Sequence, residues 1–300
     1  MSINVRSYDR EKDYERVGRF LTDTYRPGKQ HANWFLSRWE YMHFHPMLDN
    51  AVLPCIGIWE DNGTIIGVAN FEHSLGLTYF QVHPKYSFLK PDMLTYAEKH
   101  LIGTKEDGTK YIGALINDFD TEFETAAKQY DFHESSEYSE CMSEFVIPVP
   151  FPEISVPDGF RIISLADKDD LYKTNRLIYR GFNHPGEPPK TGPEERRLMQ
   201  SAPNFNKYLN IIIQADNGDY CSYAGLWYEP ELNIAYVEPV CTDPDYRLRG
   251  LGTAAVLEGI RRCGELGASL AFVGNEIPFY ISMGFKKLYN INLWTKEIPA

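Results

Sequence analysis

The sequence has no apolar stretch long enough to cross a membrane. A spanning helix needs about 18 consecutive apolar residues, and charged or polar residues interrupt every apolar run here before that length. The first residues, MSINVRSYDREKDYERV, are charged throughout and lack the apolar core of a signal peptide. We therefore expect a cytoplasmic protein without a membrane partner.

Cysteine is scarce and is never arranged in metal-binding or redox pairs. The five cysteines are odd in number and widely spaced, without a C-x-x-C motif. This pattern favours reduced thiols in a cytoplasmic protein. The sequence also lacks H-E-x-x-H, G-x-S-x-G and Walker motifs. Glu40, His43 and His45 are the one cluster that would suit a metal, but they lie in a helix-like, tryptophan-rich stretch, so partly buried or surface histidines are favoured and no metal is expected.

The chain is poor in positive charge. Thirty lysines and arginines face 42 aspartates and glutamates, a formal net charge of -12. Nucleic acids require a basic face, so this balance argues against a nucleic-acid partner. The same field would suit a cationic substrate.

Length and composition predict two domains. Three hundred residues with 43% hydrophobic content can form two cores of ordinary size. Prolines crowd the stretch IPVPFPEISVPDGF, residues 147–160, and exclude a helix interior or a central strand there. We read this stretch as a linker between domains at 1–150 and 151–300.

The two halves repeat one order of elements. Residues 5–21 and 160–179 each combine a short strand pattern, an acidic turn and a helical apolar period. Asp-Asn-Gly then lies between apolar runs in both halves, at 61–63 and 216–218, and predicts a hairpin. Pro-x-Tyr recurs at 84–86 and 244–246. Two copies of one α/β unit explain this order.

The second copy contains a glycine-rich turn that predicts an anion site. Residues 233–242 read as a strand, in which Pro239 predicts a bulge. The turn RLRGLG, residues 247–252, then opens an alanine-rich helix that Gly267 ends. A helix that starts at glycines exposes unpaired N–H groups to a phosphate, and the arginines add positive charge. The alternative is a sharp turn whose arginines are only solvated.

The turn and the residues around it resemble the GNAT superfamily of acyl-CoA-dependent N-acyltransferases. The resemblance rests on Arg-x-x-Gly-x-Gly at 247–252 and on Tyr280-x-x-x-Gly284-Phe285. It extends over about 160–298, with a fainter copy at about 3–147. The plan is similar to that of tandem members such as mycothiol synthase.

This resemblance implies a fold and a cofactor site. The fold is α/β, with two tandem domains, each a mixed, mostly antiparallel sheet flanked by helices and splayed between its fourth and fifth strands. Acetyl-CoA is the implied acyl donor and lies in the split. Pantetheine contacts are expected from backbone groups around Val240, Cys241 and Thr242. The pyrophosphate is expected on the turn and helix start, at Arg247, Leu248, Arg249, Gly250, Leu251, Gly252 and Thr253.

The chemistry of N-acetylation needs a base, an oxyanion site and an acid. An alkyl amine is only about 0.1% free base at pH 7, so its proton must be removed. Glu238 is the candidate base, on the face of Val240 if no bulge intervenes; the alternative is an edge glutamate paired with a cation. The resemblance maps Tyr280 beside the departing sulfur as general acid; the alternative is a core aromatic next to Phe279 and Phe285.

The first copy lacks these groups. Residues 87–92, SFLKPD, replace the glycine-rich turn, and Asp131 and Ala127 stand where Gly284 and Tyr280 stand in the second copy. We therefore expect one acetyl-CoA site per chain, in the second half, and a primary amine of a small molecule or peptide as acceptor. Two alternatives stay open: a non-catalytic CoA-binding or interaction module, and an aminoacyl-tRNA-dependent transferase.

Overall fold

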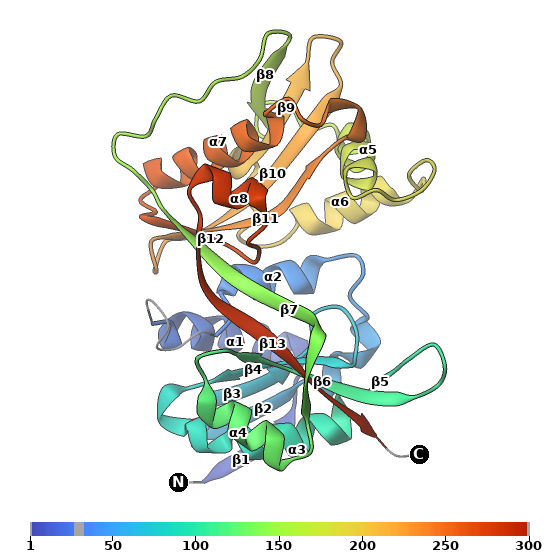
Figure 1. Cartoon of the computed structure of the whole chain (residues 1–300), viewed down its shortest axis with the longest axis vertical. Coiled ribbons are helices and arrows are strands. Elements are labelled where there is room, and N and C mark those ends of the chain that lie inside the picture. Colours follow the sequence, from blue (N-terminus) through green and yellow to red (C-terminus); the bar gives the residue numbers. More distant parts are fainter. Residues whose placement is uncertain (1, 27–32, 299–300) are drawn as a thin grey trace. The chain divides into compact units, whose positions relative to one another are not determined.

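The computed structural model describes residues 2–26 and 33–298 (Figure 1). The chain divides into two compact units. The first unit comprises Met1–His43, Met47–Met142 and Leu288–Ala300, and the second comprises Phe44–Pro46 and Ser143–Lys287. Relative to the expected division at residue 150, residues 143–150 lie in the second unit and Leu288–Ala300 lies in the first.

The first unit is a mixed sheet with helices on both faces. Its strand order is β1-β2-β3-β4-β6-β13-β7, and β5 pairs with β6. Helices α1 and α2 lie on one side of these strands, and α3 and α4 on the other (Figure 1). The elements are β1 (Ile3–Ser7), α1 (Arg10–Thr24), α2 (Leu36–Phe44), η2 (Asn50–Cys55), β2 (Gly57–Asp61), β3 (Thr64–Asn70), β4 (Leu77–Val82), η3 (Pro84–Leu89), α3 (Lys90–His100), β5 (Gly103–Thr104), β6 (Lys110–Asn117), α4 (Thr121–Gln129), β7 (His133–Val146) and β13 (Lys286–Ile298).

The second unit repeats this plan. Its strand order is β8-β9-β10-β11-β12-β7. Apolar residues of α7 form one core with the sheet, and residues of α5 form a second core on the opposite face. The elements are β8 (Phe160–Ser164), α5 (Leu171–Gly181), α6 (Gly192–Gln200), η4 (Lys207–Leu209), β9 (Asn210–Ala215), β10 (Tyr220–Glu229), β11 (Ile234–Thr242), η5 (Pro244–Tyr246), α7 (Leu251–Glu265), β12 (Leu270–Val273) and α8 (Pro278–Met283).

Side-chain alternation along the strands produces these two cores. Ile211 and Ile213 of β9 pack in the α7 core, whereas Ile212 packs in the α5 core. A strand with both faces covered reads as a continuous apolar run, as residues 211–213 do. The acidic turn expected before the helix of the second copy is also found. The Asp170 side chain accepts a hydrogen bond from the Lys173 N–H and caps α5.

Each unit has one pair of parallel strands, and that pair separates along its length. In the second unit β11 pairs with β12 only from Ile234 to Tyr236, yet β11 continues to Thr242. In the first unit β4 pairs with β6 only at Leu77 and Thr78, yet β4 continues to Val82. Each sheet therefore has a split in which one strand edge is left to other partners.

The bulge expected at Pro239 is confirmed. Ala224 of β10 faces Val240, but Leu226 faces Val237, so Glu238 and Pro239 together oppose Gly225. A side chain at position 225 would collide with this bulge, since an added Cβ would lie 2.8 Å from the Glu238 carbonyl oxygen. Glycine is needed there because the two backbones approach closely.

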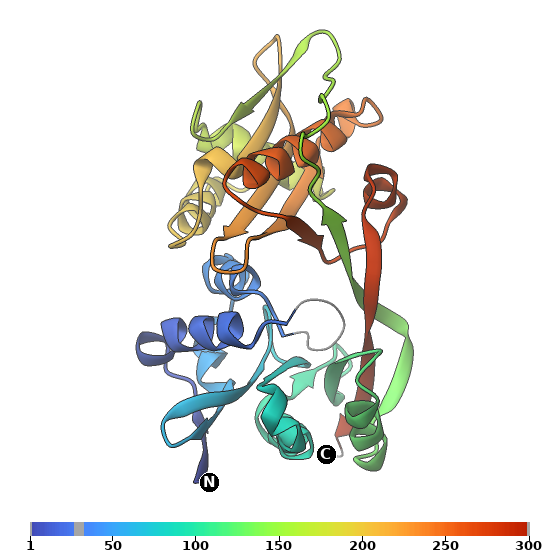
Figure 2. The same ribbon diagram turned by 90° about the vertical axis from the view of Figure 1, so that its left-hand side faces the viewer.

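The last strand of each copy belongs to the sheet of the other unit. Residues 291–298 of β13 pair antiparallel with β6 in the first unit. Residues 143–146 of β7 pair antiparallel with β12 in the second unit. The sequence-based boundary missed this exchange. In both views β7 and β13 run beside each other as long strands (Figures 1 and 2).

The tandem α/β fold expected from the sequence is confirmed. Both predicted hairpins are present, as β2–β3 and β9–β10, and most of the proline-rich stretch 147–160 lies outside helices and strands. Across residues 2–26 and 33–298, no helix combines the length and apolarity that a membrane span requires.

Candidate active site

The free edge of β11 presents backbone groups to the split of the second unit. The Asp243 N–H donates to the Cys221 carbonyl at 2.9 Å, which makes this a hydrogen-bonded antiparallel pair. Because such pairs alternate along a ladder, Cys241 is bonded to β10, whereas Val240 and Thr242 direct their N–H and C=O groups away from it. Val240 and Thr242 thus face the split.

Cys241 has a different position from its two neighbours. Its side chain packs in the α5 core, where a Cβ on Gly181 would lie 2.7 Å from the Cys241 Cβ. Burial raises the pKa of the Cys241 thiol to about 12. The Cys241 side chain therefore packs α5 against β11. Of Val240, Cys241 and Thr242, the three residues expected near pantetheine, only Cys241 has backbone N–H and C=O groups that are bonded to β10.

The predicted anion site begins with two residues in the left-handed region. Leu248 has φ 60° and Gly250 has φ 76°, and α7 starts directly after Gly250. No side chain caps this helix, and its first internal bond runs from the Ala254 N–H to the Gly250 carbonyl at 3.0 Å. The N–H groups of Leu251, Gly252 and Thr253 precede that bond, so they and the positive helix end are available to an anion.

Gly252 lets three elements meet at the helix start. A Cβ at this position would lie 3.2 Å from both the Phe279 ring and the Thr242 Oγ1. The end of β11, the start of α7 and α8 therefore converge here. In contrast, nothing lies within 4 Å of a Cβ built on Gly250, which faces open space.

The two arginines of the turn differ in their partners. Arg247 donates to three oxygen atoms: the Thr242 carbonyl at 3.1 Å, the Gly181 carbonyl at 2.8 Å and the Asn183 Oδ1 at 2.8 Å. Its guanidinium thus ties the turn to the end of α5. Arg249 is exposed, donates to the Asp245 carbonyl at 3.2 Å and lies 5.6 Å from the Tyr246 ring centroid.

An ion pair between Arg180 and Asp243, which the sequence did not predict, also holds the turn before α7 in place. Asp243 is fully buried and accepts from Arg180 at 2.6 and 3.0 Å. Burial by itself would raise the pKa of the Asp243 carboxyl. The hydrogen bonds that the carboxyl accepts from Arg180 and from the Asp245 N–H outweigh burial and keep this pKa below its usual value. The sequence marks Asp243 only as a turn residue, and nothing in it pairs position 180 with position 243.

The two candidate catalytic side chains are electrostatically coupled. Tyr280 lies on α8, is 7% exposed and has ring centroids of Phe279 and Phe285 at 4.9 and 5.6 Å. Burial, followed by the charge of Glu238, raises the pKa of Tyr280 above its usual value. The phenol therefore keeps its proton at neutral pH, and the Glu238 charge acts on it.

The bulge decides where Glu238 lies. Val237 and Val240 both pack in the α7 core although they are three residues apart, so the alternation breaks between them. Glu238 lies within the bulge, so simple alternation along the strand does not fix its face. The expectation that Glu238 shares the face of Val240 held only without a bulge, and the bulge removes that condition. The indole of Trp227 donates to the Glu238 carbonyl at 3.1 Å and supports the bulge.

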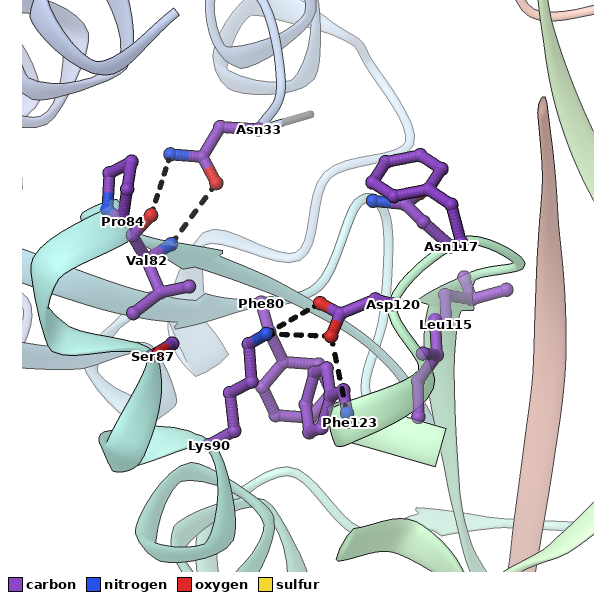
Figure 3. A pocket seen from close by; sticks show the side chains of 12 residues that line it. Asn33, Phe80, Val82, Pro84, Ser87, Lys90, Leu115, Asn117, Asp120 and Phe123 are labelled. Carbon is purple, nitrogen blue, oxygen red and sulfur yellow. Dashed lines mark hydrogen bonds and ion pairs between the residues drawn. The ribbon is translucent and has the colours of Figure 1, made fainter. Parts of the chain in front are cut away.

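In the first unit the corresponding strand edge is already occupied by the chain itself (Figure 3). His83 N–H donates to the Ile66 carbonyl at 2.8 Å, so Val82 and Phe80 are the residues that face the split. The Asn33 carboxamide pairs with Val82: its Oδ1 accepts from the Val82 N–H at 3.1 Å and its Nδ2 donates to the Val82 carbonyl at 3.4 Å. Val82 matches Thr242 in the repeat.

The helices that border the first split are joined by an ion pair. Lys90, at the start of α3, donates to both carboxylate oxygens of Asp120 at 2.6 and 2.7 Å, and Asp120 caps α4 (Figure 3). Asp92 accepts from the Trp59 indole at 2.7 Å. Neither α7 nor α3 has a side-chain cap, but α7 starts directly after Gly250, whereas α3 starts at Lys90, which is bonded across the split.

The possible metal cluster around His43 has another explanation. The Tyr8 hydroxyl and His43 Nε2 are hydrogen-bonded at 2.8 Å, and His43 Nδ1 lies 2.9 Å from the Trp39 carbonyl oxygen. Both ring nitrogens are therefore used within the core. No group of three metal-binding side chains occurs among the residues for which the structure gives positions.

The family comparison agrees with this geometry. Residues 173–285 match the model described as "Acetyltransferase (GNAT) family", a segment that runs from α5 to the end of α8. It includes the bulged strand, the uncapped helix and Tyr280. No curated protein sequence matches the chain.

Solved structures match over the whole chain. A GCN5-related N-acetyltransferase from Sphaerobacter thermophilus is 15% identical, with 99% of this chain and 96% of that chain covered and a TM-score of 0.66. A tandem GNAT protein from the clavulanic acid biosynthesis pathway is 14% identical, with both chains fully covered and a TM-score of 0.66. A Saccharomyces cerevisiae N-myristoyltransferase with bound myristoyl-CoA is 12% identical, covering 98% and 78%, with a TM-score of 0.53. At these identities the likeness establishes the fold.

Residues 173–285 thus match the GNAT acetyltransferase family model, and the whole chain shares the fold of solved tandem GNAT proteins.

Proposed function

We propose that the second unit transfers an acetyl group from acetyl-CoA to a primary amine of a small molecule or peptide. The observation that carries this proposal is the uncapped start of α7 beside the free edge of β11. A helix end with three available N–H groups suits a pyrophosphate. A strand edge on which the Val240 N–H and C=O and the Thr242 N–H point away from β10 suits the amides of pantetheine.

The turn residues divide this work. Amides from Leu248 to Thr253 bind the pyrophosphate, and Arg249 adds an exposed positive charge. Arg247 orders the turn through its bonds to Thr242, Gly181 and Asn183, and a direct phosphate contact by Arg247 is a further part of the proposal. The backbone groups of Val240 and Thr242 hold pantetheine, while Cys241 keeps β11 in place.

Two side chains handle the protons. Glu238 accepts the proton that the amine loses, directly or through a water molecule, so that the amine nitrogen attacks the acetyl carbonyl carbon. A β11 N–H stabilises the oxyanion of the tetrahedral intermediate, a contact that contributes about 3 kcal/mol in comparable enzymes. Tyr280 donates its proton to the sulfur as the carbon–sulfur bond breaks. The products are the amide and free CoA.

The electrostatic coupling of Glu238 and Tyr280 supports these roles. Burial and the Glu238 charge both favour the protonated phenol, so Tyr280 starts the reaction as a donor. When Glu238 takes up a proton it loses its negative charge, which is one of the two causes of the raised Tyr280 pKa. The acid thereby becomes stronger at the stage when the thiolate departs.

An amine panel with acetyl-CoA tests the proposal. Thiol release is measured for the full chain with small amines and amino-terminal peptides, and Gly250→Glu serves as the control that blocks the donor site. Release that depends on one amine class and disappears in the control supports acetyl transfer. Acetyl-CoA binding without release for any amine would instead favour a CoA-binding module, and no binding at all would favour a donor other than acyl-CoA.

A further inference from the structure

The split of the first unit contains a cavity of about 190 Å³ (Figure 3). Phenyl rings of Phe80, Phe119 and Phe123 form its apolar wall, and Ser87, Lys90 and Asp120 supply polar groups. The cavity lies entirely within the first unit, so its occupancy does not require acyl transfer.

The strand edge beside this cavity already binds an amide. Asn33 pairs its carboxamide with the N–H and C=O of Val82. Phe80 is the next residue of β4 whose N–H and C=O point away from β3, since the hydrogen-bonded pairs of β3 and β4 alternate. Pairing between β4 and β6 ends at Thr78, before Phe80. Phe80 thus presents the same donor and acceptor to the cavity as Val82 presents to Asn33.

The charges that line the cavity balance each other. Lys90 and Asp120 form one ion pair, and the other side chains that line the cavity are neutral among the residues that the structure describes. Lys90 uses two of its three N–H bonds on Asp120. A ligand with a net charge would find no uncompensated counter-charge here and would lose hydration on entry. A neutral ligand with a paired donor and acceptor has no such cost.

We propose that this cavity binds a small uncharged amide whose apolar part packs against the three phenyl rings. The amide donates to the Phe80 carbonyl and accepts from the Phe80 N–H, as the Asn33 side chain does at Val82. Ser87 and Lys90, which line the cavity, bind a second polar atom. The N-acetylated amines that the second unit is proposed to make belong to this class.

Three probes of one size separate amide recognition from charge or shape. Binding of benzamide, benzoate and benzylamine to the full chain is measured by ligand-observed NMR titration. Benzamide is expected to bind at least ten times more tightly than the other two. Equal affinities for all three, or no saturable benzamide binding below about 10 mM, would overturn the proposal.

A pair of variants locates the site. Ser87→Trp fills the cavity from a half-buried lining position, and Lys85→Trp places the same side chain at an exposed position two residues away. Benzamide affinity should fall at least tenfold in Ser87→Trp and stay unchanged in Lys85→Trp. Circular dichroism and denaturant unfolding report that both variants are folded. Unchanged benzamide affinity in a folded Ser87→Trp would contradict the assignment.

Discussion

Tyr280 and His43 are buried titratable side chains whose pKa values move in opposite directions. Burial disfavours the charged form of each, so the pKa of the acidic phenol is raised and that of the basic imidazole is lowered. Both groups are therefore neutral at pH 7. The charge of Glu238 acts on Tyr280, whereas His43 is hydrogen-bonded to Tyr8 and to the Trp39 carbonyl.

Tyr280→Phe tests the role of the phenol. The ring packing against Phe279 and Phe285 is kept and only the proton donor is lost. We expect kcat to fall by roughly 100-fold with little change in acetyl-CoA affinity, the scale typical of general acid–base assistance. Steady-state kinetics and calorimetry measure the two effects. If Tyr280→Phe has the wild-type kcat under conditions where the chemical step limits the rate, Tyr280 is a packing residue. Tyr280→Ala should then lower the free energy of unfolding by about 3 kcal/mol.

His43 predicts a pH dependence of stability. Burial lowers its pKa from 6.5 to about 3. The unfolded chain takes up a proton below about pH 6.5 and the folded chain does not until about pH 3. The free energy of unfolding should therefore fall as pH decreases from 6.5, by up to ~1.4 kcal/mol per pH unit, and should not change above 6.5 from this cause.

Denaturant unfolding between pH 4.5 and 6.5 measures this slope. His43→Asn should show a shallower slope than the wild type, and substitution of the exposed His184 should not change it. The same slope in His43→Asn and the wild type would show that another group titrates.

At the scale of elements, β11, the turn and α7 follow the sequence closely because local signals fix them. Pro239 predicted the bulge and residues 247–252 a glycine-rich turn before a helix, and both are found, with positive φ at Leu248 and Gly250. The hydrogen-bonding partners of the turn could not be predicted in this way. Arg247 bonds to Gly181 and Asn183, more than sixty positions away. No local pattern specifies such contacts, since they depend on how α5 packs on the sheet.

Gly250→Glu tests the phosphate turn. A side chain there is strained by about 1–2 kcal/mol because of the positive φ, and its carboxylate would repel a pyrophosphate. Gly186→Glu is a matched control, because Gly186 has φ 77° and the same open surroundings. Both variants should lose similar stability, but only Gly250→Glu should lose acetyl-CoA binding in calorimetry. Equal binding by both would move the donor site elsewhere.

At the scale of the whole molecule, the repeat was visible in the sequence but the exchange of last strands was not. Residues 133–146 and 286–298 form strands in the structure, and no local sequence pattern says which sheet receives them. Their partners are set by tertiary packing, for example by Leu293 against Gly113 and by Trp294, which is 2% exposed. A division of the chain at its proline-rich linker therefore separates each sheet from one of its strands.

Truncation after Lys287 tests this exchange. The first unit would lose residues 288–298 of β13, the antiparallel partner of β6, together with buried Trp294. Limited proteolysis should then cut within residues 1–142 much faster than in the full chain. Unchanged protease resistance of that region would show that the first unit does not need the carboxy-terminal strand.

The difference between the two splits is the central claim of this account. In the second unit α7 starts at Gly250 beside the open edge of β11 at Val240, whereas in the first unit Asn33 lies on the strand edge and Lys90 is bonded to Asp120 across the split. Isothermal titration calorimetry of the full chain with acetyl-CoA tests this directly. The account predicts one site per chain, abolished by Gly250→Glu. Two equivalent sites, or one site that survives Gly250→Glu, would contradict it.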